Sequence, residues 1–329
     1  MRVVNLENLK SAVNGALRVF EQNNRLVLRR FTESQERLFD QTLNYVNKPL
    51  KAKSSSSMSL DFVSNTNTFE LNVSTFVAST RTPCFFDVYC DNELVAHCGY
   101  NQMQDGFVKV NATFKQGEKR IKIYFPNLFD AQIESFYIDD GASFKPYKST
   151  KKWLFLGDSI TQGYVSEYPS NTYANIVARA FDVQALNQAI GGAYFAAEEI
   201  DENSPFIPDV VSVAYGTNDW AHGYDVEKNA TEYFEKISRI YKNAKKVCIT
   251  PIWRDDTKYR QILSDKPHES VGKLLSKICQ NIGDITVIDG YSLVSHSHDN
   301  YIEDLLHPND KGFLEYGENL VKILKEKNI

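Results

Sequence analysis

Hydrophobic and polar positions alternate in short segments along the first half of the chain. These segments are rich in Val, Phe, Tyr and Thr, are separated by polar turn residues, and occupy residues 16–20, 25–31, 60–64, 69–77, 85–98, 106–114 and 120–126. A period of two predicts half-buried strands, and Asp91-Asn92 inside one segment predicts a tight hairpin. Many short strands with frequent turns predict an all-β, jelly-roll-like sandwich over residues 1–148.

In the second half, apolar segments alternate with longer segments of helical period. Strands are expected at 153–157, 183–187, 209–216, 246–250 and 285–289, and helices at 171–181, 226–241, 271–282 and 312–324. This alternation predicts an α/β domain over residues 149–329, with three α/β/α layers and a doubly wound, flavodoxin-like parallel sheet of five strands. In such sheets, functional sites lie at the carboxyl ends of the strands.

Two polar stretches carry further expectations about the layout of the chain. Residues 141–152 are rich in Gly, Ser, Pro and Lys, which is typical of a linker between the two halves. The four consecutive serines at 54–57 form a run too short for a low-complexity linker, and we expect an exposed loop there.

Charge and composition narrow the class of protein. There are 37 Lys and Arg against 42 Asp and Glu, giving a net charge of −5 with no long block of one sign, which argues against nucleic acid or a polybasic membrane anchor as a partner. We find no apolar run of membrane-spanning length, so no membrane insertion is expected. Glu7 and Lys10 interrupt any signal-like core, and the five scattered cysteines indicate the reduced thiols of a cytoplasmic protein.

Ser159 follows the apolar strand at 153–157 directly, after Gly157 and Asp158. One interpretation is a glycine turn followed by a helix cap. The other is a nucleophile at the edge of the sheet, which requires a base and a group that orients the base. Asp304 stands three residues before His307, a spacing that lets the carboxylate reach the imidazole within one turn. Taken alone, this pair also fits ordinary surface capping.

A serine nucleophile also needs hydrogen-bond donors for the oxyanion of the tetrahedral intermediate. Gly191 and Gly192 follow one predicted strand, and their backbone N–H groups can approach a ligand without an intervening side chain. Asn218 follows the next strand and carries a neutral amide donor. Each stretch, taken alone, also fits a glycine-containing turn.

Four motifs occur in one order along the second half: GDSIT at 157–161, NQAIGG at 187–192, GTND at 216–219 and DLLHP at 304–308. Together they resemble the SGNH hydrolases, also called GDSL esterases, over roughly residues 153 to 310. The resemblance implies that Ser159 is the nucleophile, His307 the base and Asp304 its orienter. It also implies that the oxyanion donors are the Ser159 N–H, Gly192 and Asn218. Because Gly191 is adjacent to Gly192, the position of the glycine donor is ambiguous by one residue.

Other catalytic classes fit the sequence less well. Thr161 stands where the Gly-x-Ser-x-Gly motif of α/β-hydrolases requires glycine, which excludes that scaffold. His296 and His298 make a metal site conceivable, but the nucleophile set already explains the chemistry, so neither a metal nor another cofactor is expected.

The expected activity is hydrolysis of short-chain acyl esters, acetyl above all, through a Ser-His-Asp triad and an acyl-enzyme. A sandwich that precedes an SGNH domain is similar to the architecture of some bacterial carbohydrate esterases, so an acetylated sugar is the expected small-molecule partner. Alternatives are a lipase, lysophospholipase or thioesterase of the same family, an acyltransferase, or a glycan-binding protein with a secondary hydrolase half. The role of the sandwich and the formation of a homo-oligomer are left open.

Overall fold

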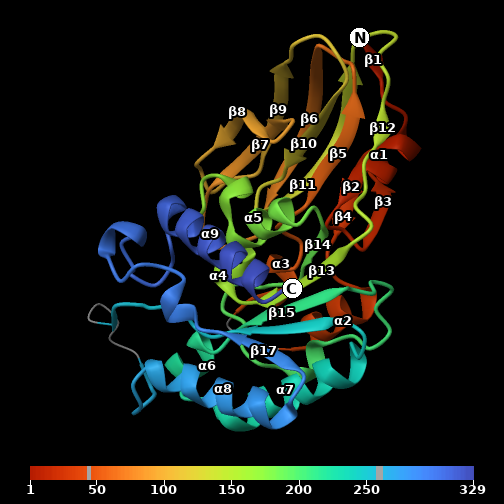
Figure 1. The fold of residues 1–329 in the computed structure, drawn as a ribbon. Coiled ribbons are helices and arrows are strands. Elements are labelled where there is room, and N and C mark those ends of the chain that lie inside the picture. The colour runs from red at the N-terminus through yellow and green to blue at the C-terminus, as the bar shows by residue number, and fades with distance from the viewer. Residues whose placement is uncertain (43–45, 257–261) are drawn as a thin grey trace.

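The computed structural model describes residues 1–42, 46–256 and 262–329. Two antiparallel sheets occupy the N-terminal half, and a parallel sheet flanked by helices occupies the C-terminal half (Figure 1). The N-terminus lies at the far end of the antiparallel sheets, and the C-terminus lies in the helical half.

The first antiparallel sheet has the strand order β3-β4-β11-β6-β9, and β1 pairs with β11. Its strands are β1 (Arg2–Val3), β3 (Arg18–Gln22), β4 (Arg25–Arg29), β6 (Thr68–Val77), β9 (Gly106–Thr113) and β11 (Phe129–Ile138). The second sheet has the order β12-β5-β10-β7-β8, and β2 pairs with β5. Its strands are β2 (Val13–Asn14), β5 (Ser59–Ser64), β7 (Cys84–Cys90), β8 (Glu93–Tyr100), β10 (Lys119–Tyr124) and β12 (Lys145–Pro146).

The apolar faces of these two sheets enclose one core, to which Leu71 and Val73 of β6 and Ile121 and Ile123 of β10 contribute. The predicted hairpin is confirmed: Asp91 and Asn92 join β7 to β8, and both have positive φ, at 48° and 72°. This backbone matches the twist of the flanking strands. The jelly-roll connection of the strands and the boundary at residue 148 stay predictions.

The C-terminal sheet confirms the predicted five-stranded parallel arrangement, with the order β14-β13-β15-β16-β17. Its strands are β13 (Lys152–Gly157), β14 (Gln184–Asn187), β15 (Val210–Ala214), β16 (Lys245–Ile249) and β17 (Ile285–Ile288). Alternate residues of β13 face opposite sides: Trp153 and Phe155 join one core, and Leu154 and Leu156 the other. Burial on both faces explains why this strand is continuously apolar.

Helices cover both faces of the parallel sheet (Figure 1). Helices α5 (Tyr173–Ala180) and α9 (Asp310–Glu326) contribute to one core, and α7 (Val226–Ile240) and α8 (Glu269–Ile282) contribute to the other. The short helices are α4 (Ser159–Gln162), α6 (Thr217–Ala221), η1 (Pro169–Asn171), η2 (Ala197–Glu199), η4 (Gly290–Ser292) and η5 (His298–Asn300). None of the helices in the described part of the chain has the length and apolar character needed to cross a membrane.

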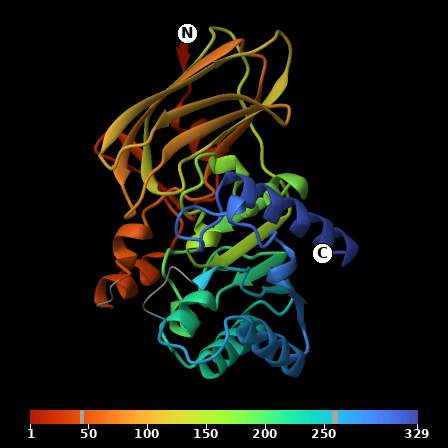
Figure 2. The ribbon, with the colours of Figure 1, turned by 90° about the vertical axis from the view of Figure 1, so that its left-hand side faces the viewer.

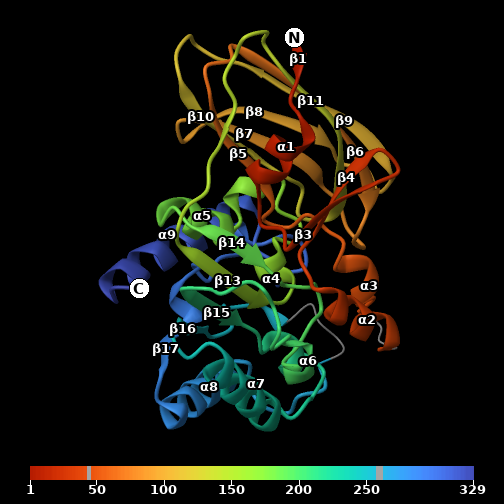
Figure 3. The ribbon, with the colours of Figure 1, turned by 90° about the vertical axis from the view of Figure 1, so that its right-hand side faces the viewer.

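Three further helices belong to the N-terminal half: α1 (Leu6–Ala12), α2 (Glu33–Gln41) and α3 (Lys48–Lys51). Helix α2 begins with a complete capping box between Thr32 and Gln35. Figures 2 and 3 show α2 and α3 below the antiparallel sheets and beside the parallel sheet. This segment therefore connects the two halves structurally.

One expectation about a polar stretch is wrong. The serines at 54–57 are buried, with exposed fractions between 0% and 5%, because the hydroxyls of Ser54, Ser56 and Ser57 lie at the contact between the two halves and that of Ser55 accepts the Ala131 N–H. The stretch at 141–152 joins the two halves, and it also contributes β12, which pairs with β5, and the first residue of β13.

Candidate active site

Ser159 is the first residue of α4 and lies two positions beyond Gly157, the last residue of β13. Asp158 caps the helix, because its Oδ1 accepts the Ile160 N–H at 3.0 Å. A β-carbon on Gly157 would lie 2.1 Å from Thr161 Oγ1, so glycine is required for the tight passage from strand to helix. This turn therefore contains a helix cap, which is Asp158, and it also places Ser159 at the carboxyl edge of the sheet.

The structure brings Ser159, His307 and Asp304 together. Ser159 Oγ lies 2.7 Å from His307 Nε2, and His307 Nδ1 lies 2.6 Å from Asp304 Oδ2. Asp304 and His307 come from one turn, in which Leu305 adopts a left-handed φ of 51°. This turn lets Asp304 Oδ1 accept the backbone N–H groups of Leu306 and His307, each at 2.9 Å.

The contacts of Asp304 determine its charge. Burial opposes ionisation, but the hydrogen bonds and the charge of His307, together with the two backbone N–H donors, outweigh burial and hold the pKa of Asp304 below its ordinary value. An ionised Asp304 accepts the Nδ1–H of His307. This fixes the tautomer in which Nε2 can accept the Ser159 proton.

The glycine loop lies beside Ser159, and Asn218 contacts the same loop. A β-carbon on Gly191 would be 3.5 Å from Ser159 Cβ, and Asn218 Nδ2 donates to Ala193 O at 2.9 Å. The Gly191 N–H already donates to Gln162 Oε1 at 2.6 Å. Gly192, with a left-handed φ of 86°, is therefore the better candidate of the two glycines.

The N-terminal half contributes to this site, which the sequence analysis missed. Arg30 is fully buried, and its guanidinium donates to the backbone oxygens of Asn187 and Ala189, in the loop that leads to the two glycines. The same guanidinium donates to Lys51 O at 3.2 Å, Ser54 O at 2.7 Å and Ser54 Oγ at 2.9 Å. Burial lowers the pKa of Arg30 to about 9. Arg30 thus makes five hydrogen bonds, two to the C-terminal half and three within its own half.

The buried serines hold the other side of the same contact. Ser56 Oγ donates to Gln162 O at 2.6 Å, at the end of α4, and Gln162 Nε2 donates to Ser54 Oγ at 3.0 Å. Asn187 Nδ2 donates to Ser57 Oγ at 3.1 Å. The turn that carries Ser159 is therefore packed against the N-terminal half. In the sequence, the run of four small polar residues at 54–57 is the feature that could have indicated such a contact.

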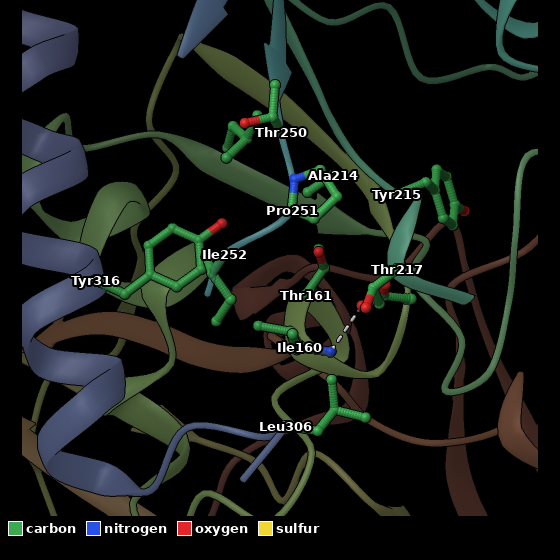
Figure 4. A pocket seen from close by; sticks show the side chains of 12 residues that line it. Ile160, Thr161, Ala214, Tyr215, Thr217, Thr250, Pro251, Ile252, Leu306 and Tyr316 are labelled. Carbon is green, nitrogen blue, oxygen red and sulfur yellow. Dashed lines mark hydrogen bonds between the residues drawn. The ribbon is translucent and has the colours of Figure 1, made fainter. Parts of the chain in front are cut away.

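A pocket of about 20 Å³ lies at the Asp158–Thr161 turn, lined by side chains from the carboxyl edge of the sheet, from Leu306 and from α9 (Figure 4). Ser159, His307 and Asn218 are not part of its wall, so it is not a substrate pocket. Its volume matches about one water molecule. Burial raises the pKa of Asp158, in the wall of this pocket, to about 7.

The histidines considered for a metal site lie elsewhere. The rings of His296 and His298 stack near Trp253, and His298 Nε2 lies 2.7 Å from Asp255 Oδ2. In the described part of the chain, no group of three or more His, Cys, Asp or Glu side chains could hold a metal ion.

The hydrogen-bonded series Ser159–His307–Asp304, at the carboxyl edge of a parallel sheet, has the geometry of a serine-hydrolase site. Residues 155–313 match the sequence profile of the GDSL-like lipase/acylhydrolase family. The chain therefore carries a GDSL-like lipase/acylhydrolase domain, and the protein is an ester hydrolase of the SGNH type. A search of curated proteins found no match.

Solved structures of similar fold cover nearly the whole chain. A putative GDSL-like lipase from Bacteroides ovatus is 14% identical with a TM-score of 0.77, covering 99% of this chain and 97% of its own. The salicylyl-acyltransferase SsfX3 of a tetracycline biosynthetic pathway is 18% identical with a TM-score of 0.76, covering 96% and 94%. The acetyl xylan esterase Est2A from the rumen bacterium Butyrivibrio proteoclasticus is 15% identical with a TM-score of 0.64, covering 99% and 98%. These similarities concern the fold, in both halves of the chain.

Proposed function

We propose that the protein is a serine esterase that hydrolyses short-chain acyl esters, acetyl esters above all, on carbohydrates. The observation that carries the proposal is the 2.7 Å contact between Ser159 Oγ and His307 Nε2, with Asp304 bound to the opposite ring nitrogen. A serine hydroxyl becomes a useful nucleophile when a base oriented in this way can accept its proton.

In the proposed first step, Ser159 Oγ attacks the acyl carbonyl carbon while His307 Nε2 takes the hydroxyl proton. The resulting oxyanion is stabilised by the N–H groups of Ser159 and Gly192 and by the Asn218 side-chain amide. The ester C–O bond then breaks, and His307 donates its proton to the leaving alcohol.

In the second step, a water molecule attacks the acyl-enzyme carbonyl carbon while His307 accepts a proton from the water. A second oxyanion forms in the same position. Its collapse breaks the bond to Ser159 Oγ, which regains a proton from His307, and the carboxylic acid leaves.

Restricted space at Ser159 supports a short acyl group. Ser159 is only 7% exposed, and the Tyr164 ring lies 4.8 Å from the ring of His307, to which Ser159 is hydrogen-bonded. The acetyl xylan esterase of similar fold supports a sugar as the alcohol part of the substrate, by analogy of architecture.

The test is hydrolysis of p-nitrophenyl esters from acetyl to palmitoyl, by the protein and by Ser159→Ala. Short-chain activity that Ser159→Ala abolishes supports the proposal, and acetylated oligosaccharides are the next substrates. Activity that rises with chain length would indicate a lipase instead. Absence of Ser159-dependent turnover on these esters and on acetylated oligosaccharides would contradict the esterase and favour a glycan-binding role.

Acyl transfer is a second candidate, supported by the similarity of fold to a salicylyl-acyltransferase over 96% of this chain. In that reaction an acceptor alcohol, rather than water, attacks the acyl-enzyme. The measurement is the ratio of acylated sugar to free acid when a sugar acceptor is added to the ester assay. A ratio above one favours the transferase, and free acid as the main product favours the esterase.

A further inference from the structure

Lys51 reaches the glycine loop from the other half of the molecule. It is the last residue of α3, and its Nζ donates to Gly191 O at 2.8 Å although 140 residues separate the two in sequence. The residue is only 8% exposed, and the Arg30 guanidinium binds its backbone oxygen. A buried ammonium beside the candidate oxyanion donors is a feature that the proposed mechanism does not use.

We propose that Lys51 is a positioning residue that orients the peptide between Gly191 and Gly192, so that the Gly192 N–H faces the oxyanion. The inference rests on the proposed function and adds a residue to it. A trans peptide is planar, so its C=O and N–H point in opposite directions. When Lys51 holds the Gly191 carbonyl oxygen on one side, the N–H of Gly192 is directed to the other.

This loop needs an external restraint because two consecutive glycines lack an intrinsic backbone preference. The peptide that precedes Gly191 is held by its N–H, which donates to Gln162 Oε1 at 2.6 Å. The peptide that follows is held by its C=O, through Lys51. Gly191 is thus fixed at both of its backbone polar groups, and the second contact sets the direction of the proposed donor.

The charge of Lys51 also suits this role. Burial lowers its pKa, and no ion pair of its Nζ occurs within residues 1–42, 46–256 and 262–329. Within the described residues, the Lys51 ammonium therefore donates to the Gly191 carbonyl oxygen. A cation on this oxygen polarises the peptide and makes the Gly192 N–H a stronger donor.

Lys119 provides a matched control within the same chain. Its Nζ donates to a backbone oxygen, that of Thr66, at the same distance of 2.8 Å, and the residue is 6% exposed. It lies in β10 of the antiparallel sheets, away from the glycine loop. Lys119→Met therefore removes the same kind of buried hydrogen bond without affecting the proposed oxyanion donors.

The experiment compares the wild type with Lys51→Met, Lys51→Arg, Lys119→Met and Ser159→Ala. For each, kcat and KM are measured separately on p-nitrophenyl acetate, and folding is measured by thermal unfolding. Lys51→Met is expected to lower kcat about 10- to 100-fold, because a misdirected donor loses part of the roughly 10²–10³-fold that one oxyanion donor contributes. KM should change by less than about threefold, since the interaction matters mainly in the transition state. Lys51→Arg, which keeps a donor, should recover part of kcat.

Crystal structures of the wild type and of Lys51→Met provide a readout besides turnover. We expect the Gly191–Gly192 peptide to rotate or to adopt more than one orientation in the variant. An unchanged peptide together with an unchanged kcat would overturn the inference, as would an equal loss of kcat in Lys119→Met. If the wild type itself shows no Ser159-dependent turnover, the proposed function fails, and the peptide orientation alone then decides whether Lys51 positions the loop.

Discussion

Asp304 combines two tasks at the scale of a single residue. One carboxylate oxygen accepts two backbone N–H groups and so shapes the turn, while the other accepts the His307 ring N–H. The first task sets where the imidazole lies, and the second sets which of its nitrogens faces Ser159. Both depend on a carboxylate that stays ionised, in agreement with its lowered pKa.

We predict that Asp304→Asn lowers kcat by about 10³- to 10⁴-fold, because an amide can donate to Nδ1 and so stabilise the wrong tautomer. The measurement is steady-state hydrolysis of p-nitrophenyl acetate. Glu303→Gln, which changes the exposed neighbouring carboxylate, is the control and should keep kcat within about twofold. A loss below about tenfold in Asp304→Asn would show that the carboxylate does not orient the base.

Asp219 gives a prediction about pH and stability. It is fully buried, Oδ1 accepts the Phe195 N–H at 3.1 Å, and burial raises its pKa to about 7. The folded state therefore binds a proton more tightly than the unfolded state. This contribution to stability is complete below about pH 4 and is lost as the pH rises through about 7.

We expect Asp219→Asn to reduce the decline in the free energy of unfolding between pH 4 and pH 8 by about 2–4 kcal/mol. Urea unfolding at several pH values measures this change. Burial also raises the pKa of Asp158 to about 7, and Asp158 still titrates in the variant. Part of the decline in the free energy of unfolding should therefore remain. Equal pH dependence in the wild type and the variant would contradict a raised pKa for Asp219.

At the scale of elements, helices and strands with a regular hydrophobic period were predicted better than those that depend on distant contacts. The five parallel strands and their four main helices follow from local pattern and agree with the structure within a few residues. Strand β11 was missed because a register shift between Ile133 and Ser135 interrupts its period, and its apolar positions change there from odd-numbered to even-numbered residues. Helix α2 was missed although Thr32 and Gln35 form a recognisable capping box.

The residues of the candidate site also differ in whether a local sequence pattern could predict them. Ser159, Asn218 and His307 follow strands or lie in a short motif, so strand topology alone brings them to one edge. The roles of Arg30 and Lys51 depend on partners far along the chain, and no local pattern distinguishes a buried cation from a solvated one. The serine run at 54–57 was misjudged for this reason: its burial depends on the other half of the molecule.

A substitution of Arg30 tests how much the contact between the two halves contributes to stability. Arg30→Lys is expected to lower the free energy of unfolding by about 3 kcal/mol or more, because a single ammonium cannot satisfy the buried acceptors that the guanidinium binds. Arg25→Lys is the control, because Arg25 lies in β4, which ends one residue before Arg30, and the new ammonium can keep the ion pair with Glu134. Denaturant unfolding measures both. Equal small losses in the two variants would show that the Arg30 contacts add little.

At the scale of the whole molecule, the contact between the two halves makes the stability of each half depend on the other. Buried hydrogen bonds cross between them and link Arg30 with Asn187 and Ala189, Ser54 and Ser56 with Gln162, and Ser57 with Asn187. We therefore expect both halves to unfold in a single transition. Hydrogen exchange with mass spectrometry at increasing urea can follow β6 and β10 against β13 and β15. Midpoints that differ by more than about 0.5 M would contradict this coupling, since a typical m-value converts that gap into roughly 1 kcal/mol.

The buried position of Arg30 has a consequence for how the protein is made. Its guanidinium binds Asn187 O, which lies 157 positions further along the chain. At about 5–20 residues per second, a ribosome needs roughly 10–30 s to add that length of chain. During this interval the N-terminal sheets can form, but Arg30, Ser54, Ser56 and Ser57 still lack their hydrogen-bond partners from the C-terminal half. The N-terminal half is thus synthesised first, but its buried hydrogen bonds are completed only when the segments around Ser159 and Asn187 pack against it.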